Sequence, residues 1–389
     1  MNQDPVQNVP LLDADDITRV REPLERSWTL PPAAYTDKKI FEVERKTIFA
    51  HDWICVARAD QLPKPGDYVC VDLLDQPIVV TRGKDTKLRG LSRICLHRAM
   101  PVTEGSGNAT RFVCPYHNWT YELDGQLRSA PMMSEVEDFD ASKCRLPQLR
   151  LEEWNGFVFV NRDPQAPDLA PRLQGLAKLI ENYDFGNLVV AATTEFDSPW
   201  NWKILVENFM EAYHHISIHK TTFQPLYPAR DSIVEDNNGA PWTFLRMVGN
   251  SKARAEAEAQ QGPAMFPKLT ETEQSQLLAM NVFPTLLFAL SETGGFWYQL
   301  EPGAHDAMRL RIHFLLPAEV AEMLDDDTRA ATIEAVRGIH TEDIEANEGP
   351  WRGLQAGLTS QGRLSTFEKA IWQLNQLWLD RMKPFLGNA

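Results

Sequence analysis

The chain has 389 residues, 43% of them hydrophobic, and a formal net charge of −15 at pH 7. This length exceeds what one hydrophobic core usually serves, so it predicts two domains. The acidic balance argues against a nucleic-acid or anionic-membrane partner, because like charges repel. No apolar run reaches membrane-spanning length, no signal peptide is apparent, and five scattered cysteines suit a reducing compartment. We therefore expect a soluble, cytoplasmic protein.

The first half of the chain changes from polar and helical to β-rich. Residues 1–45 read as a polar lead followed by a helix, whose sequence runs over 41–50. Between about residues 50 and 165, short β-rich runs are separated by Pro, Gly and Asp, which is typical of a small all-β domain. These runs are 53–59, 68–74, 77–83 and 156–162.

After a predicted linker at 164–172, helices and strands mix. Strands are expected within 281–290 and 310–317, and a helical tail from about 329 to 384. The segment 250–275 is charged and low in apolar residues, which predicts a surface excursion or lid.

Two short loops supply the first candidate metal ligands: Cys95, His97, Cys114 and His117. Thiolate is the soft ligand that iron–sulfur and zinc sites prefer. Structural zinc usually takes like ligands from each loop, whereas each loop here supplies one Cys and one His. A Rieske [2Fe-2S] centre needs this pairing, because two histidines replace two cysteines on one iron. A zinc-stabilised binding module is the alternative.

The segment 95–127 resembles the signature of Rieske domains in ring-hydroxylating and demethylating oxygenases. Its flanking residues also fit: Arg98, Tyr116, Trp119 and Gly125. Ala99 and Asn118 depart from the pattern, since such sequences generally carry glycine there. Asparagine tolerates a positive φ better than alanine does, so the second loop is expected to keep its conformation more readily than the first.

A second group, Glu207, Glu211, His214, His215 and His219, lies within thirteen residues. Two imidazoles and one carboxylate on one face of Fe(II) leave open positions for dioxygen. On an unbroken helix His215 and His219 share a face, whereas His214 and His219 diverge by about 140°. Helical geometry alone favours the first pair. The residues at 216–218 are weak helix formers, however, so the helix could end just after His214.

The segment 201–219 is similar to the mononuclear-iron motif of Rieske oxygenase catalytic domains. This resemblance implies that His214 and His219 bind iron, and that Asp343 is the third ligand. It leaves His215 as a spare residue of the pocket, or as the alternative ligand. The neighbours of Asp343 could instead form a merely solvated helical face: Glu342, Glu345 and Glu348.

The same resemblance implies roles for Asn208 and Glu211 beside the iron. Glu211 stands where the family has an acidic residue that links the two metal centres, and a ligating histidine usually donates its second N–H to such a carboxylate. In the family this bridge runs from His117 of one subunit to Glu211 of its neighbour. A head-to-tail homotrimer follows, because heterologous interfaces close into rings.

The resemblance implies an α+β architecture in three segments. Residues 1–45 would pack on the catalytic domain, 46–165 would form the all-β Rieske domain, and 166–389 would form a helix-grip catalytic domain of the START/Bet v 1 type with an antiparallel sheet. The protein would be a terminal oxygenase that uses O2 to hydroxylate an aromatic or other small organic substrate; O- or N-demethylation is the alternative. Without a nucleotide-binding motif, it would depend on an NAD(P)H-dependent reductase, with or without a ferredoxin.

Aromatic residues of the second domain predict an apolar substrate cavity. They are Phe209, Phe283, Phe288, Phe296 and Trp297. Strand alternation should turn roughly half of them toward the core instead. An aromatic cage could also hold a quaternary ammonium group by cation–π contact. A non-enzymatic Rieske electron carrier is the rival class, but it leaves about 220 residues with a His/His/Asp set unexplained.

Overall fold

The computed structural model describes residues 11–74, 76–252, 255 and 266–386. These residues form two compact units, one spanning Trp53–Leu169 and the other combining the segments before and after it. None of the described helices is long and apolar enough to cross a membrane. Of the segment 250–275, predicted as an excursion or lid, residues 253–254 and 256–265 lie outside the described residues.

The unit Trp53–Leu169 is all-β, as its short β-branched runs predict. A seven-stranded antiparallel sheet has the order β1-β10-β9-β4-β3-β2-β5, and a second sheet has the order β6-β7-β8. The strands of the larger sheet are β1 (Ile54–Arg58), β2 (Asp67–Leu73), β3 (Gln76–Arg82), β4 (Leu88–Ser92), β5 (Ser106–Asn108), β9 (Gln148–Trp154) and β10 (Phe157–Asn161). Those of the smaller sheet are β6 (Phe112–Val113), β7 (Thr120–Tyr121) and β8 (Leu127–Ser129).

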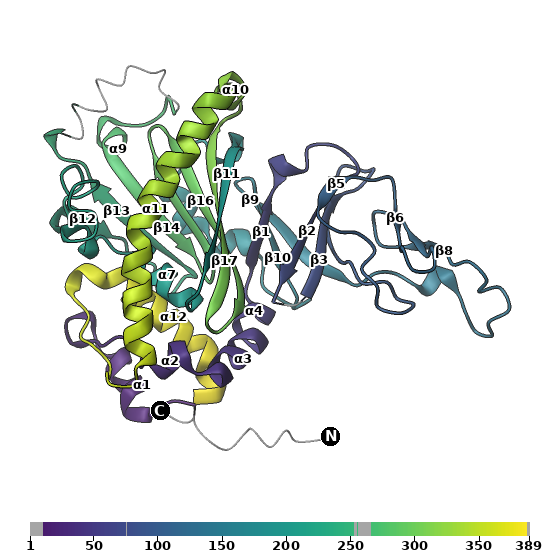
Figure 1. Ribbon diagram of the computed structural model, residues 1–389, viewed down its shortest axis with the longest axis horizontal. Coiled ribbons are helices and arrows are strands. Elements are labelled where there is room, and N and C mark those ends of the chain that lie inside the picture. Colours follow the sequence, from purple (N-terminus) through teal and green to yellow (C-terminus); the bar gives the residue numbers. More distant parts are fainter. Residues whose placement is uncertain (1–10, 75, 253–254, 256–265, 387–389) are drawn as a thin grey trace. The chain divides into compact units, whose positions relative to one another are not determined.

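The other unit is built on a seven-stranded antiparallel sheet with the order β11-β17-β16-β15-β14-β13-β12. Its strands are β11 (Leu188–Ser198), β12 (Ser232–Val234), β13 (Trp242–Val248), β14 (Gln276–Val282), β15 (Leu286–Ser291), β16 (Gly294–Ala304) and β17 (Ala307–Pro317). The long helix α11 (Asp326–Gln355) lies across one face of this sheet (Figure 1). It begins where the Asp325 carboxylate accepts the Thr328 N–H, which is a typical N-cap.

Helices from both ends of the chain pack together beside this sheet, as the purple and yellow ribbons of Figure 1 show. The N-terminal helices are α1 (Ala14–Arg21), α2 (Ala33–Thr36), α3 (Lys38–Lys46) and α4 (Ile48–His51), and the C-terminal one is α12 (Lys369–Leu386). The Trp372 indole donates to the Glu22 carbonyl at 3.0 Å, and Arg381 binds the Asp52 carboxylate at 2.9 Å. The single helix expected at 41–50 is thus two helices that break at Thr47.

The remaining helices are short: α5 (Leu169–Arg172), α6 (Gln174–Leu179), α7 (Trp202–Phe209), α9 (Glu271–Gln274) and α10 (Ala318–Met323). Of these, α7 contacts α11, and both run beside the same sheet. The predicted α+β class, with an antiparallel sheet in the second domain, is confirmed.

Candidate metal centres

Two loops of the all-β unit have the same backbone geometry. The Cys95 N–H donates to the Met100 carbonyl at 2.9 Å, and the Cys114 N–H donates to the Trp119 carbonyl at 2.8 Å. In each loop the N–H four residues after the cysteine donates back to the cysteine carbonyl, from Ala99 at 3.1 Å and from Asn118 at 3.0 Å. Each loop is therefore a tight turn that carries one Cys and one His.

Both turns require a left-handed residue at the position where the family generally has glycine. Ala99 has φ 53° and Asn118 has φ 57°. The first loop thus keeps its conformation despite alanine, at a cost of about 1–2 kcal/mol for a side chain in this region. In the following turn Gly125 has φ 87°, and a Cβ there would meet Leu146 at 3.3 Å.

The four residues of these loops fit a cluster that is half buried and half exposed. Cys95 and Cys114 are buried, whereas His97 and His117 are exposed. The two histidine Nδ1 atoms are 3.2 Å apart, so both rings face one point. The His97 ring also stacks on the buried Trp119, with centroids 5.0 Å apart. Two thiolates on the protein side and two imidazoles on the solvent side are the donors of a Rieske centre.

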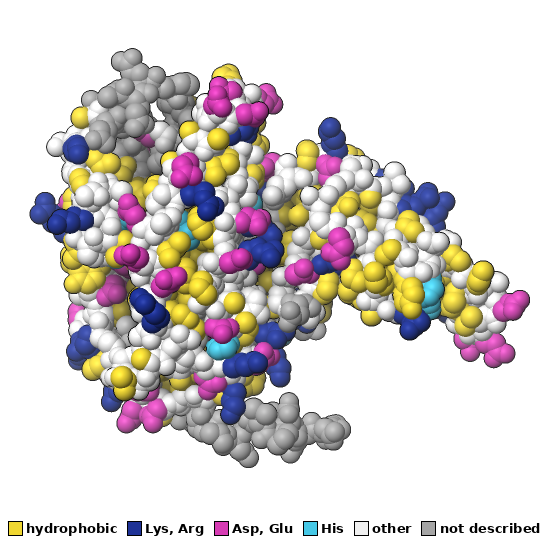
Figure 2. Space-filling view, in the orientation of Figure 1, with side chains coloured by type: hydrophobic (Ala, Val, Ile, Leu, Met, Phe, Trp, Pro, Cys, Tyr) yellow, Lys and Arg dark blue, Asp and Glu magenta, His cyan; other side chains and the backbone are white. Residues whose placement is uncertain are grey.

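Hydrophobic side chains surround the exposed pair of histidines. Leu96, Met100 and Tyr116 are all exposed on the same two loops. In Figure 2 histidine and hydrophobic side chains lie together on the surface of this unit. Contiguous exposed apolar surface of this kind often marks a site of interaction with another protein.

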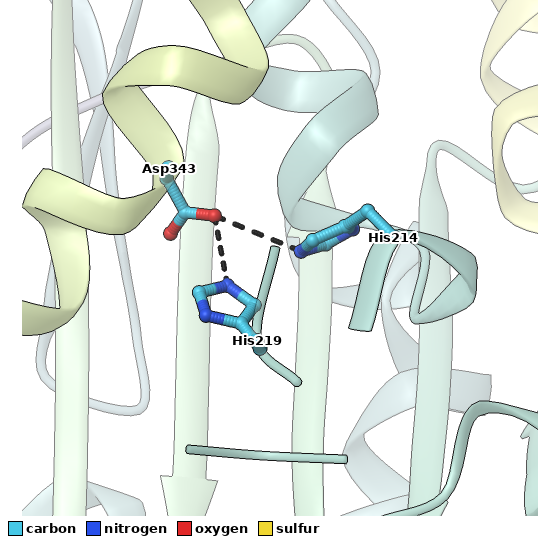
Figure 3. A group of neighbouring side chains, drawn as sticks. All are labelled: His214, His219 and Asp343. Atoms are coloured by element: carbon cyan, nitrogen blue, oxygen red, sulfur yellow. Dashed lines mark hydrogen bonds and ion pairs between the residues drawn. The ribbon is translucent and has the colours of Figure 1, made fainter. Parts of the chain in front are cut away.

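The second group of ligands is brought together because α7 ends earlier than expected. The helix stops at Phe209, and a 3-10 turn over Tyr213–Ile216 follows. The helical spacing that favours His215 with His219 therefore does not apply. His214 and His219 come from this irregular segment, and Asp343 reaches them from α11 (Figure 3).

The donor atoms of His214, His219 and Asp343 lie within 4.8 Å of one another. Asp343 Oδ1 is 2.9 Å from His219 Nε2 and 3.6 Å from His214 Nε2. Donors on one face of an octahedral ion with bonds of about 2.1 Å lie about 3 Å apart, so the spacing fits a single metal ion. Two imidazoles and one carboxylate are the donor set of a facial iron site.

Each of the two histidines has a carboxylate on its other ring nitrogen. Glu211 Oε1 is 2.5 Å from His214 Nδ1, and Glu211 Oε2 accepts the His214 backbone N–H at 3.0 Å. Glu342 Oε2 is 2.6 Å from His219 Nδ1. Burial lowers the pKa of His219, but its hydrogen bonds to Asp343 and Glu342 outweigh burial and raise it. When a metal ion displaces the proton from Nε2, Nδ1 stays protonated toward its carboxylate and each Nε2 offers its lone pair to the common centre.

Comparison with protein families identifies the two domains of the chain. The model for the Rieske [2Fe-2S] domain matches residues 52–140, and that for the catalytic domain of the ring-hydroxylating alpha subunit matches residues 185–384. The chain belongs to the Rieske oxygenases. It carries a Rieske [2Fe-2S] cluster and a mononuclear iron, and it is an oxygenase subunit. The predicted family, cofactors and enzyme class are confirmed.

Relatives within the Rieske oxygenases include carnitine, glycine betaine and quaternary ammonium monooxygenases. The oxygenase subunit of carnitine monooxygenase from Acinetobacter baumannii is 31% identical over 347 residues, covering 87% of this chain and 89% of that one. The glycine betaine monooxygenase oxygenase subunit from Chromohalobacter salexigens is 32% identical, covering 64% and 56%. The structure of the quaternary ammonium Rieske monooxygenase CntA with L-carnitine has a TM-score of 0.79 at 28% identity, covering 97% and 100%.

In this oxygenase His214, His219 and Asp343 line a cavity of about 260 Å³. Aromatic rings line it together with His215: Phe209, Phe223, Tyr227, Phe296 and Tyr298. The His215 ring stacks on Phe223, and its Nδ1 lies 3.4 Å from the Tyr227 carbonyl. Burial, with the neighbouring His214 and His219, lowers the pKa of His215 to about 3. Asn208 lines the cavity too, and its amide oxygen lies 3.4 Å from the Asn347 amide nitrogen.

Three of the aromatic residues predicted for the pocket do not line this cavity. Phe288 pairs with Trp297 in the sheet, whereas the neighbouring pair, Ala289 with Phe296, faces the cavity. Because side chains alternate across a sheet, Phe288 and Trp297 lie on the opposite face. Phe283 packs edge-on against Trp202 instead, with centroids 6.5 Å apart. The prediction for these three residues is therefore corrected.

The sequence did not single out Phe223, Tyr227 and Tyr298 of the cavity, or Glu342 beside His219. Glu342 was grouped with the acidic residues of a solvated helical face, but it contacts His219 and accepts a hydrogen bond from Thr222 at 2.8 Å. One signal could have indicated it. Ligating histidines usually donate to a second carboxylate, and only Glu211 had been given that role, for His214.

Proposed function

We propose that this oxygenase hydroxylates a carbon bonded to the nitrogen of a small methylated ammonium compound. One atom of O2 enters the C–H bond, the other leaves as water, and two electrons and two protons are consumed. The hydroxylated ammonium compound then loses its hydroxyl proton as the C–N bond breaks with its electron pair going to nitrogen, which releases a tertiary amine, an aldehyde and one proton. Hydroxylation of an aromatic or other small organic substrate and O- or N-demethylation are both expected from the sequence, and this proposal favours dealkylation at nitrogen.

We assign the iron ligands as His214, His219 and Asp343. When bound there, Fe(II) supplies the site at which O2 is reduced. The chain's own residues prepare this site: Glu211 and Glu342 hold the two Nδ1–H groups, so both rings keep a neutral Nε2 toward the metal. The aromatic walls exclude water around the substrate, which protects reactive species from side reactions.

The charge of the cavity carries the proposal. Glu211 and Asp343 line it, Glu342 lies directly behind His219, and no Lys or Arg is among the described lining residues. Three carboxylates thus face the two positive charges of a ferrous ion, which leaves the site favourable for a cation. Aromatic faces attract such a cation through their quadrupoles, by about 0.5–2 kcal/mol each. The relatives that oxidise carnitine and glycine betaine support the same substrate class.

The proposal includes a head-to-tail homotrimer in which the Rieske loops of one subunit meet the iron site of the next. Beside Glu211, the side chains of Tyr213 and Ile216 are 44% and 52% exposed, and Tyr213 stacks on the exposed Phe367. This apolar surface suits the exposed Leu96, Met100 and Tyr116 of another copy. Glu211 would then link His214 to His117 of the partner subunit. Light scattering that finds the active enzyme monomeric contradicts this assembly.

A cytoplasmic location stays a prediction. Electrons would come from an NAD(P)H-dependent reductase, with or without a ferredoxin. Purified chain with NADH alone should show no turnover. Addition of a reductase should start O2 consumption when a substrate is present.

A matched pair of compounds tests the proposed substrate class. Choline and 3,3-dimethylbutan-1-ol have the same shape, but only choline carries a charge. We expect choline to bind the reduced, iron-loaded enzyme at least tenfold more tightly in anaerobic calorimetry. Equal or tighter binding of the neutral compound refutes the proposal. If an unsubstituted aromatic hydrocarbon binds more tightly than either compound, ring hydroxylation is favoured instead.

A further inference from the structure

We infer that the preferred substrate carries its only charge on the ammonium group and has an apolar tail where carnitine and glycine betaine have a carboxylate. This inference rests on the proposed function, because it concerns the part of the same cavity that lies away from the iron. The preferred substrate would thus differ from carnitine and glycine betaine, the zwitterions for which the relatives are named.

The cavity has a polar end and an apolar end. His214, His219, Asp343 and Glu211 form the polar end. The sheet lines the cavity with alternate residues of its strands: Met247 on β13, Leu277 and Ala279 on β14, Ala289 and Ser291 on β15, and Phe296 on β16. Val336 and Ile339 of α11 also line it, two turns and one turn before Asp343. An ammonium group held near the carboxylates therefore extends its tail along hydrocarbon.

The strand register explains why this wall is apolar over its whole width. Ala279 pairs with Ala289, and Ala289 pairs with Phe296, so the three side chains lie in one row on the cavity face. The small alanines leave the space, and the phenyl ring borders it. A tail that fills this row gains about 0.8 kcal/mol per buried methylene.

A carboxylate at the end of that tail would meet no opposite charge among the residues that the structure describes. The polar groups of the sheet wall are neutral: the hydroxyls of Ser291 and Tyr298. The Ser291 hydroxyl already contacts Thr293 Oγ1 at 3.0 Å. A buried carboxylate without a counter-ion pays a large desolvation cost, and the carboxylates of the iron site add repulsion.

Two compounds that differ in one group test this inference. Butyltrimethylammonium and γ-butyrobetaine share the trimethylammonium head and the three-methylene chain, and end in a methyl group and a carboxylate respectively. We expect butyltrimethylammonium to have a dissociation constant at least tenfold lower in anaerobic calorimetry with the reduced, iron-loaded enzyme. Equal or tighter binding of γ-butyrobetaine overturns the inference.

A variant with an added counter-ion makes the test reciprocal. Ser291 is only partly buried at the end of β15, so Ser291→Arg can place a guanidinium at the apolar end of the cavity. This change should lower the dissociation constant of γ-butyrobetaine at least tenfold and raise that of butyltrimethylammonium. Ser291→Gln introduces a long, polar but uncharged side chain, so the enzyme should still prefer butyltrimethylammonium to γ-butyrobetaine. If Ser291→Gln has the same effect as Ser291→Arg, the effect is not one of charge and the inference fails.

The two comparisons separate failure of the inference from failure of the proposed function. If choline binds no better than its neutral isostere, the cation site itself is wrong. If choline binds better than its isostere but γ-butyrobetaine binds as well as butyltrimethylammonium, only the apolar-tail inference is wrong.

Discussion

Removal of the Glu342 carboxylate should weaken iron binding without touching an iron ligand. Glu342 Oε2 lies 2.6 Å from His219 Nδ1 and also accepts the Thr222 hydroxyl at 2.8 Å. In Glu342→Ala the His219 ring loses the partner that fixes its tautomer and its orientation. Loss of such a partner typically lowers metal affinity about 10–100-fold, which is about 1.4–2.8 kcal/mol.

Two further variants show whether charge or hydrogen bonding matters. Glu342→Gln keeps an acceptor for the Nδ1–H but removes the charge, so its loss of affinity should be smaller than that of Glu342→Ala. Glu345→Ala changes an exposed carboxylate on the same helix and serves as the matched control. It should bind iron as the unaltered enzyme does.

Iron content after dialysis against graded concentrations of a ferrous chelator measures the affinity. The visible absorbance of the Rieske cluster provides an internal reference, because the candidate cluster ligands lie in the other unit. The cluster signal should stay constant while the mononuclear iron is lost. The reasoning is refuted if Glu342→Ala retains its iron as well as the unaltered enzyme does, or if Glu345→Ala loses as much.

Three other predictions each concern the substitution of one residue. The Tyr121 hydroxyl lies 3.3 Å from Cys95 Sγ, so Tyr121→Phe should lower the cluster potential by about 40 mV in an EPR redox titration, as loss of one hydrogen bond of about 1 kcal/mol implies. Ala99 has φ 53°, so Ala99→Gly should stabilise the cluster loop by about 1 kcal/mol, seen as loss of visible absorbance at a higher temperature. Burial raises the pKa of Glu207, which accepts from Tyr35, to about 7. The native state then holds a proton that the unfolded chain releases near pH 4.5, so stability should fall by up to about 3 kcal/mol as pH rises from 4.5 to 7. Glu207→Gln should remove most of that fall from the pH dependence of the melting temperature; an unchanged profile contradicts it.

The cluster site could be predicted from sequence because its chemistry is local. Each pair of ligands lies within four consecutive residues, and the loop geometry is set by short-range hydrogen bonds such as that from Cys114 to Trp119. The unlike pairing of Cys and His then distinguishes the cluster from zinc. Even the two positions without glycine were visible, and both have the left-handed φ that the turn requires.

The choice between His214 and His215 could not be derived from helical spacing. That argument assumes a continuous helix, but α7 ends at Phe209, where the Met210 N–H already bonds to both Val206 and Glu207 carbonyls. Glu211 then accepts both the backbone N–H and the ring nitrogen of His214. One side chain thus sets the local backbone and the ring together, which periodicity does not encode.

Only some of the aromatic residues predicted for the pocket line the cavity, because alternation divides a strand into two faces but does not show which face borders the cavity. Phe288 and Phe296 both lie on strands beside the cavity, yet only Phe296 points into it. The register between β15 and β16 decides this, and register depends on pairing between strands that the sequence alone does not fix. Asp343 and Glu342 present the same difficulty on α11, since neighbouring acidic residues differ only in what they contact.

The carboxylates that orient the histidines also determine which substrates the cavity accepts. Glu211 and Glu342 are needed because an imidazole must keep its proton on Nδ1 to offer Nε2 to a metal. Their charges do not end at the rings: together with Asp343 they exceed the charge of one ferrous ion, and the described cavity wall has no Lys or Arg to balance them. Orientation of the ligands and selection of a cation are therefore coupled. Glu342→Gln should weaken binding of butyltrimethylammonium even in molecules that retain iron, while binding of a neutral isostere stays unchanged.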